Sequence, residues 1–107
     1  MAKKKWIKRF LPFWVHRHLR EREKFAKLRA RDGNHCWFCG SKMRFGPPYN
    51  KGKAATIEHI KPLSKGGNGA LENLALCHVG CNRHLADRSG EEKRRMREAM
   101  VRRTHAR

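Results

Sequence analysis

The chain has few acidic residues and no long apolar stretch. Only 9 of its 107 residues are Asp or Glu, against 27 Lys and Arg, and the formal net charge is +18. No segment approaches the roughly 20 apolar residues that a membrane-spanning helix needs, so we expect no membrane partner. So large an excess of one charge is costly without a polyanion nearby, and nucleic acid is the partner that we expect.

Internal repeats and linkers rich in Pro, Gly or Ser are also missing, so the sequence predicts a single domain over residues 1–107. A short chain with 34% charged residues cannot bury a large core and needs another source of stability. The basic N-terminal segment has an interrupted apolar run and no small-residue cleavage site after it. We expect an intracellular, cytoplasmic, reduced and soluble protein that acts as a monomer.

Positive charge is concentrated at both ends of the chain. Residues 1–31 hold twelve basic and two acidic residues, and residues 91–107 hold seven and three. We therefore expect the ends to bind phosphate groups and the middle to carry the chemistry. Packing, DNA contact and partner docking are all open for the N-terminal aromatic residues, and we favour packing for Trp6, Phe10, Phe13 and Trp14.

Hydrophobic spacing and capping patterns predict a helix near each end. Leu19, Phe25 and Leu28 recur at helical spacing within residues 16–31. Ser89 and Glu92 form a capping pattern that opens a basic C-terminal helix. We divide the domain into an N-terminal arm and helix at residues 1–31, a core at 32–88 and a C-terminal helix at 89–107.

The core sequence predicts an α+β fold. Residues 56–60 and the run NLALC are two short stretches of β-formers joined by a long connection, and residues 41–55 are expected to be irregular. A further helix should begin near Cys81 and continue through NRHLADR.

Four cysteines form two close pairs, Cys36 with Cys39 and Cys77 with Cys81. A C-x2-C turn directs two sulfurs to one metal, and the second pair can do so across a strand end and the first helical turn. Disulfides and free thiols are the alternatives, but a structural Zn²⁺ held by all four cysteines suits a reduced protein better. Four thiolates complete a tetrahedron, so we expect two nearby candidates to stay off the metal: His78 and His84.

Four polar residues with catalytic chemistry lie between or beside the cysteine pairs: Glu58, His59, Asn73 and Asn82. A carboxylate and an amide oxygen suit a hard divalent cation, and an imidazole with a pKa near ~6.5 can take a proton from water. Glu58 and His59 are adjacent, so on a regular strand their side chains leave on opposite faces. Singly, these residues have ordinary explanations, as strand histidine, surface carboxylate, turn former and helix cap.

The combined spacing resembles that of the HNH endonucleases. The pattern C-x2-C … EHIKPLSKGG … ENLALC … CN, over roughly residues 31–88, is similar to the family pattern C-x2-C … DHI-x-P-x-S-x-GG … NL-x-x-LC-x-x-C-[HN]. The resemblance implies a ββα-metal fold with flanking helices and metal-dependent hydrolysis of DNA. It implies that His59 is the general base, that Glu58 and Asn82 bind Mg²⁺, Mn²⁺ or another divalent ion, and that Asn73 supports the loop.

Three departures from the family pattern stand out. Glu58 replaces the more frequent aspartate, so the ligand reaches further. Asn82 replaces a histidine, which shifts the preference towards oxygen-binding Mg²⁺ or Mn²⁺. The second cysteine pair has three intervening residues where two are usual, and we expect Val79 and Gly80 to absorb the extra one.

Two other functions fit the same residues. A zinc module could bind DNA or RNA without cleaving it, or the chain could be an adaptor that docks on a larger phage or restriction assembly. The small size resembles that of phage-encoded nucleases, which suggests a bacterial or phage-infected cell and a phage or restriction partner protein. In each case we expect phosphate contacts from Arg31, Lys61, Lys65, Arg83, Arg94 and Arg95.

Overall fold

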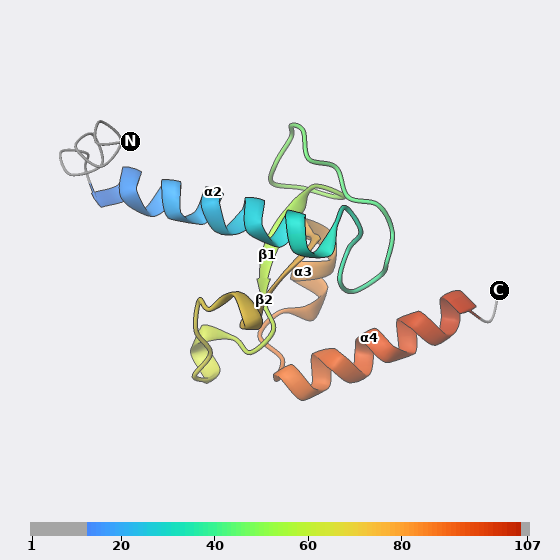
Figure 1. Cartoon of the computed structure of the whole chain (residues 1–107). Coiled ribbons are helices and arrows are strands. Elements are labelled where there is room, and N and C mark those ends of the chain that lie inside the picture. The colour runs from blue at the N-terminus through green and yellow to red at the C-terminus, as the bar shows by residue number, and fades with distance from the viewer. Residues whose placement is uncertain (1–12, 106–107) are drawn as a thin grey trace.

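A computed structural model of the chain describes residues 13–105, and its helices and strands form a small α+β fold (Figure 1). In chain order they are α2 (Phe13–Asp32), β1 (Ala55–His59), β2 (Leu74–His78), α3 (Val79–Leu85) and α4 (Gly90–His105). Two short 3-10 helices, η1 (Leu63–Lys65) and η2 (Leu71–Asn73), lie in the connection between the strands. The predicted fold class is therefore confirmed. The N-terminal aromatic side chains lie outside the part that is described: Trp6, Phe10, Phe13 and Trp14.

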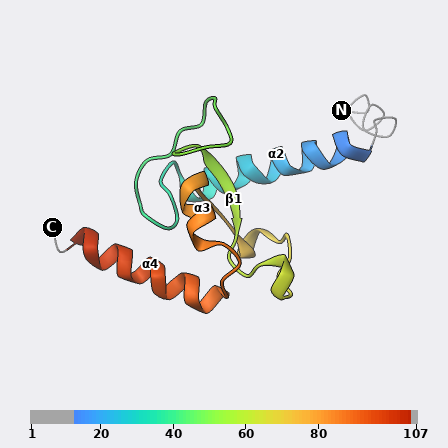
Figure 2. The ribbon, with the colours of Figure 1, turned by 180° about the vertical axis from the view of Figure 1, so that it is seen from behind.

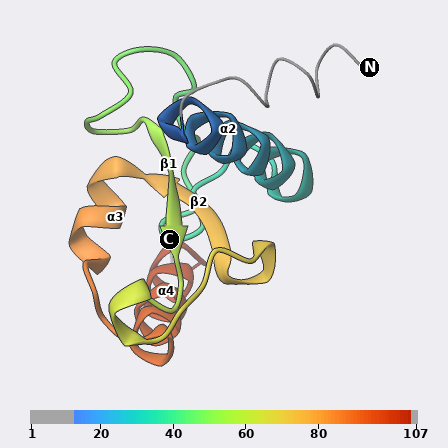
Figure 3. The ribbon, with the colours of Figure 1, turned by 90° about the vertical axis from the view of Figure 1, so that its left-hand side faces the viewer.

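The two strands form an antiparallel hairpin that positions the motif residues. Its register pairs Ala55 with His78 and His59 with Leu74. Helix α2 packs against β2, while α3 contacts both strands. Figure 3 shows the hairpin between these two helices, and Figure 2 shows α3 lying over the hairpin from behind. The sequence β1, β2, α3 is the ββα arrangement expected of residues 32–88.

The core is small, as the composition predicts. It joins α2, the turn after α2, β2 and α3 through Leu28, Cys36, Phe38, Met43, Leu74, Leu76, Cys77 and Leu85. Each large aliphatic side chain buried in this way stabilises the fold by roughly 1.5–3 kcal/mol. Helix α4 packs against the same cluster through two partly buried methionines, Met96 and Met100. The residues between Ser41 and Ala54 form only isolated bridges, as expected for an irregular segment.

Local signals explain where the helices begin and end. The backbone N–H of Gly33 donates to the carbonyl of Arg29 at 2.8 Å, and Gly33 has the positive φ of 82° that ends α2. At the start of α4, Ser89 Oγ accepts from the N–H of Glu92 at 3.2 Å, which confirms the capping pattern. Helix α3 begins two residues before Cys81 and ends earlier than predicted, because Ala86 adopts a positive φ of 51° after Leu85. No helix in residues 13–105 is long and apolar enough to cross a membrane.

Candidate functional site

Four side chains form a candidate metal-binding cluster: Cys36, Cys39, His78 and Cys81. Their sulfur and imidazole nitrogen atoms all lie within 4.8 Å of one another. Tetrahedral Zn²⁺ with Zn–S bonds near 2.3 Å separates its sulfur ligands by about 3.8 Å, so the cluster can hold zinc. None of the four cysteines is in a disulfide. The cluster joins the turn after α2 to the end of β2 and to the first turns of α3.

The hydrogen bonds of His78 orient its ring for a metal. Its Nε2 lies 3.0 Å from the carbonyl oxygen of Lys42, which can only accept, so Nε2 carries the proton. The unprotonated Nδ1 then faces the sulfurs of Cys39 at 3.3 Å and Cys81 at 3.7 Å. A backbone carbonyl that fixes the tautomer of a histidine is a frequent feature of zinc sites.

The cluster differs from the expected zinc ligand set in one member, because it contains His78 and not Cys77. Adjacent residues leave a strand on opposite sides, so these two side chains do not reach the same point. Cys77 is instead fully buried in the core. Its thiol hydrogen bonds to Cys36, which raises the pKa of Cys77 and lowers that of Cys36 to about 4.

With His78 rather than Cys77 as the partner of Cys81, the second metal-binding pair no longer has an extra intervening residue. His78 and Cys81 are separated by two residues, which is the usual spacing for such a metal-binding pair. Strand β2 runs without a bulge to His78, and α3 begins at the next residue. Val79 and Gly80 therefore absorb no extra residue, contrary to our expectation. His84, as expected, is not part of the cluster.

The electrostatics of the cluster favour a bound cation. Burial raises the pKa of Cys81, and the neighbouring sulfurs of Cys36 and Cys39 raise it further. Several thiolates gathered at one point repel one another, and a dication in their midst removes that repulsion. The cluster thus has both the geometry and the charge to hold zinc.

A second group of motif residues lies along β1. Glu58 and His59 are adjacent at the end of this strand, and Lys93 contacts the side chain of the first and the carbonyl of the second. The half-buried side chain of His59 lines a groove of about 860 Å³ that runs between α2 and β1. Burial, followed by the charges of Lys24 and Lys93, lowers the pKa of His59. The imidazole is therefore held neutral, which is the form that accepts a proton.

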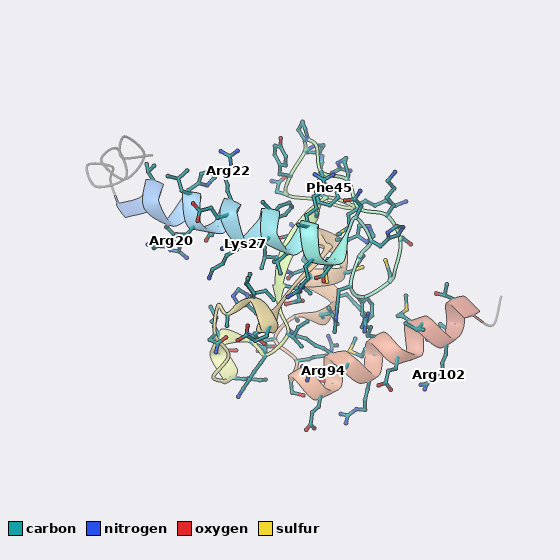
Figure 4. All side chains as sticks on the ribbon, viewed as in Figure 1. Arg20, Arg22, Lys27, Phe45, Arg94 and Arg102 are labelled. Carbon is teal, nitrogen blue, oxygen red and sulfur yellow. The ribbon has the colours of Figure 1, made fainter. Side chains whose placement is uncertain are left out.

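The groove beside His59 has cations and aromatic rings in its walls. Besides His59, its lining includes Arg22, Lys24, Phe25, Arg44, Phe45 and Tyr49. Figure 4 shows the basic side chains Arg20, Arg22 and Lys27 along α2, and Arg94 and Arg102 along α4. Helices α2 and α4 thus both present positive charge to solvent. This distribution suits a polyanion such as DNA.

Glu58 faces α4, where Lys93 binds it. Lys93 Nζ lies 3.2 Å from Glu58 Oε1 and 2.7 Å from the carbonyl oxygen of His59. The side chains of Lys93 and Glu58 are only 1% and 5% exposed. Burial raises the pKa of Glu58, and the ion pair with Lys93 partly offsets this rise.

Sequence reasoning missed the role of Lys93, because it is one of many cations in a basic helix. A signal was nevertheless present. Lys93 is three residues before Met96 and seven before Met100, so all three lie on the apolar face of α4. A charged residue on the buried face of a helix needs a partner of opposite charge.

The oxygens near β1 suit a hard divalent cation. Glu58 Oε2 is buried and has no hydrogen-bond partner within residues 13–105. Asn82 Nδ2 donates to the carbonyl of Ile57 at 3.2 Å, which brings the amide group of α3 to the same strand and leaves its oxygen as the ligand atom. A carboxylate oxygen and an amide oxygen are ligands that Mg²⁺ and Mn²⁺ prefer. The donor set therefore fits such an ion, although Glu58 is already paired with an ammonium group.

Asn73 holds the long connection between the strands. Its Oδ1 accepts from the N–H of Lys61 at 2.9 Å, and its Nδ2 donates to the carbonyls of Lys61 and Asn68 at 3.0 and 2.8 Å. In the same connection, a Cβ on Gly67 would lie 1.9 Å from the carbonyl oxygen of Lys61, so only glycine fits there. The position of Asn73 thus matches a supporting residue of the loop.

The six residues that we expected to contact phosphate fall into three groups. Arg31 donates to the carbonyls of Leu71 and Leu74 at 2.9 and 2.8 Å and pairs with Asp32 at 2.6 Å, so its guanidinium is used within the fold. Arg83 donates to the carbonyl of Asn50 at 3.2 Å from an exposed position. The other four are exposed on the surface: Lys61, Lys65, Arg94 and Arg95.

Comparison with known proteins identifies the family of the central segment. No curated protein and no solved structure matches the chain. Residues 36–88 match the HNH endonuclease family, and this segment contains the metal-binding cluster, the hairpin and α3. The match indicates nuclease or nucleic-acid-related activity with a metal site. The domain formed by residues 36–88 therefore belongs to the HNH endonuclease family.

Proposed function

We propose that this chain is a metal-dependent DNA endonuclease that hydrolyses phosphodiester bonds, with His59 as the general base. The observation that carries the proposal is the position of His59, whose imidazole lies in a basic groove and has a lowered pKa. A histidine that is neutral at physiological pH and open to a polyanionic substrate suits proton abstraction from water. Glu58 and Asn82 are its metal-binding partners in this proposal.

In the proposed reaction, His59 takes a proton from a water molecule, and the oxygen of that water attacks phosphorus in line with the leaving group. A divalent ion held by Glu58 and Asn82 would stabilise the charge that develops on the phosphate and on the leaving 3′ oxygen. The 3′ oxygen leaves with the electron pair of the broken P–O bond and takes a proton from solvent, so the products are a 5′-phosphate and a 3′-hydroxyl. Asn73 supports the base indirectly, because it holds the connection that follows β1.

The remaining parts of the chain have binding and structural roles in this proposal. Exposed cations on α2, α4 and the connection neutralise phosphates, which provides affinity without base recognition. Zn²⁺ at Cys36, Cys39, His78 and Cys81 links the turn after α2, the end of β2 and α3, and so supplements the small core.

The test of this proposal is plasmid cleavage by His59→Ala in the presence of Mg²⁺ or Mn²⁺. We expect the rate to fall by a factor on the order of 10² or more, the scale of a lost general base. His84→Ala is the matched control, because it removes an exposed imidazole from α3 that lies outside the groove lining. Zinc content and DNA affinity should be unchanged in both variants. Equal cleavage by His59→Ala and the wild-type chain would refute the assignment of the base.

A zinc module that binds nucleic acid without cleaving it is the second candidate. The ion pair between Glu58 and Lys93 favours it, because the carboxylate is already neutralised by a group of the chain itself. The same assay separates the two functions. If the wild-type chain binds DNA but cuts neither single-stranded nor double-stranded DNA with any divalent ion, its function is binding without cleavage, as a zinc module or an adaptor.

A further inference from the structure

We propose that Lys93 is an internal counter-cation that opposes divalent metal binding at Glu58 and thereby sets the metal affinity of the site. The proposal rests on the proposed function, since it takes Glu58 as a metal ligand. It adds a residue of α4, outside the segment that matches the family, to the determinants of the reaction. Lys93 acts through Glu58 and is a positioning residue.

The contact between Lys93 and Glu58 is built into the fold. The two residues are 35 positions apart, and their side chains are only 1% and 5% exposed. The ammonium group also donates to the carbonyl oxygen of His59 at 2.7 Å, so it binds two consecutive residues of β1. A lysine is almost never fully buried unless it is paired, so this arrangement differs in kind from an exposed ion pair.

The start of α4 directs Lys93 inwards. Ser89 caps the helix, and Gly90 lies so near Ile60 that a Cβ at this position would be 3.6 Å from the carbonyl oxygen of Ile60. The first turn of α4 therefore rests on the end of β1. Among the described cations of α4, Lys93 alone is buried, whereas the others are exposed: Arg94, Arg95, Arg97, Arg102 and Arg103. Figure 4 labels two of these exposed arginines, Arg94 and Arg102, along α4.

Charge explains why this contact opposes a metal ion. Glu58 carries a single negative charge, and the ammonium of Lys93 already occupies hydrogen-bonding distance of its Oε1. A dication bound at the unpartnered Oε2 would lie within a few ångströms of that ammonium, where two like charges repel strongly in a buried setting. Binding of the ion therefore requires Lys93 to weaken or release its contact with Glu58.

The test is the affinity for Mn²⁺ of the full zinc-loaded chain, measured from free Mn²⁺ by electron paramagnetic resonance. Replacing Lys93 by methionine keeps a side chain of similar length and removes the charge. We expect Lys93→Met to lower the Kd for Mn²⁺ by tenfold or more, on the order expected when one nearby like charge is removed. Arg102→Met is the matched control, since it removes an exposed charge from the same helix, and its Kd should stay within about twofold of wild type.

Two further variants make every result decisive. If Lys93→Met does not fold, Lys93→Gln replaces it, because the amide can still donate to the carbonyl of His59 while carrying no charge. Affinity for Mn²⁺ that is unchanged or weaker in the folded neutral variant overturns the inference. Glu58→Gln combined with the neutral residue at position 93 should lose the tight Mn²⁺ site. If that double variant still binds Mn²⁺ tightly, Glu58 is not the ligand, and the metal assignment of the proposed function fails instead.

Discussion

His78 Nδ1 lies 3.3 Å from Cys39 Sγ, although 39 positions separate the two residues in the chain. The contact joins the end of β2 to the turn that follows α2, and both segments also supply core residues. A metal at this point holds together the same parts that the core packs. Because the core is small, loss of the metal should affect the whole domain rather than one end of it.

The ligand set of the zinc site can be tested with single substitutions. We expect one zinc per purified chain, measured by elemental analysis. Cys39→Ala and His78→Ala should lose the zinc and lower the free energy of unfolding by several kcal/mol, roughly the contribution of a structural zinc to a small domain. Cys77→Ala should keep the zinc, because Cys77 lies in the core and outside the cluster. If Cys77→Ala loses the zinc and His78→Ala retains it, the four cysteines are the zinc ligands.

The outlines of the fold could be predicted because their signals are local. Gly33 ends α2, Ser89 caps α4, and short runs of β-formers predict the hairpin, each without information from distant residues. The end of α3 was predicted too late in the chain, since the positive φ of Ala86 is unusual for alanine and has no sequence signal.

The site was less predictable, because its details depend on the direction of each side chain. Cys77 and His78 are adjacent, and both residue types can bind zinc. Which of them reaches the cluster depends only on the side of β2 from which each side chain leaves. The two-residue spacing to Cys81 was the available signal. Lys93 needed tertiary information, because pairing with Glu58 depends on how α4 rests on β1.

Gly67 should be intolerant of any side chain. A Cβ there would lie 1.9 Å from the carbonyl oxygen of Lys61, so Gly67→Ala must displace the connection that Asn73 holds. We expect the free energy of unfolding to fall by roughly 2–4 kcal/mol, as for other backbone clashes. Gly46→Ala is the control, since no atom lies within 4 Å of a Cβ at this position. Similar melting temperatures for the two variants would contradict the observed path of the connection.

Salt dependence separates DNA contacts from structural cations. If exposed arginines of α4 bind phosphates, replacing Arg94 and Arg95 by glutamine should reduce the slope of log affinity against log salt by about 0.9 for each lost contact. Arg31→Gln should instead leave the slope unchanged and lower stability by roughly 1–3 kcal/mol, because carbonyls within the fold lose their donor. Filter binding over a salt series, with thermal unfolding of each variant, measures both effects. A smaller salt slope and unchanged stability for Arg31→Gln would instead show that Arg31 contacts DNA phosphates.

The pH dependence of cleavage should report the surroundings of His59. Burial and the nearby charges of Lys24 and Lys93 lower its pKa from the ordinary value of 6.5. The base is active only when neutral, so activity should persist as the pH falls through 6.5, and the acid limb of kcat/KM should have its midpoint below that value.

Lys24→Met removes one of these charges and should move that midpoint upwards, while Lys27→Met, an exposed charge on the same helix, should leave it in place. Both variants lose one positive charge from α2, so weaker DNA binding alone cannot produce a difference between them. The profile is measured at saturating Mn²⁺, with the acid limb fitted separately for each variant. An acid limb centred above 6.5, or one that shifts equally in the two variants, would show that His59 does not control the rate.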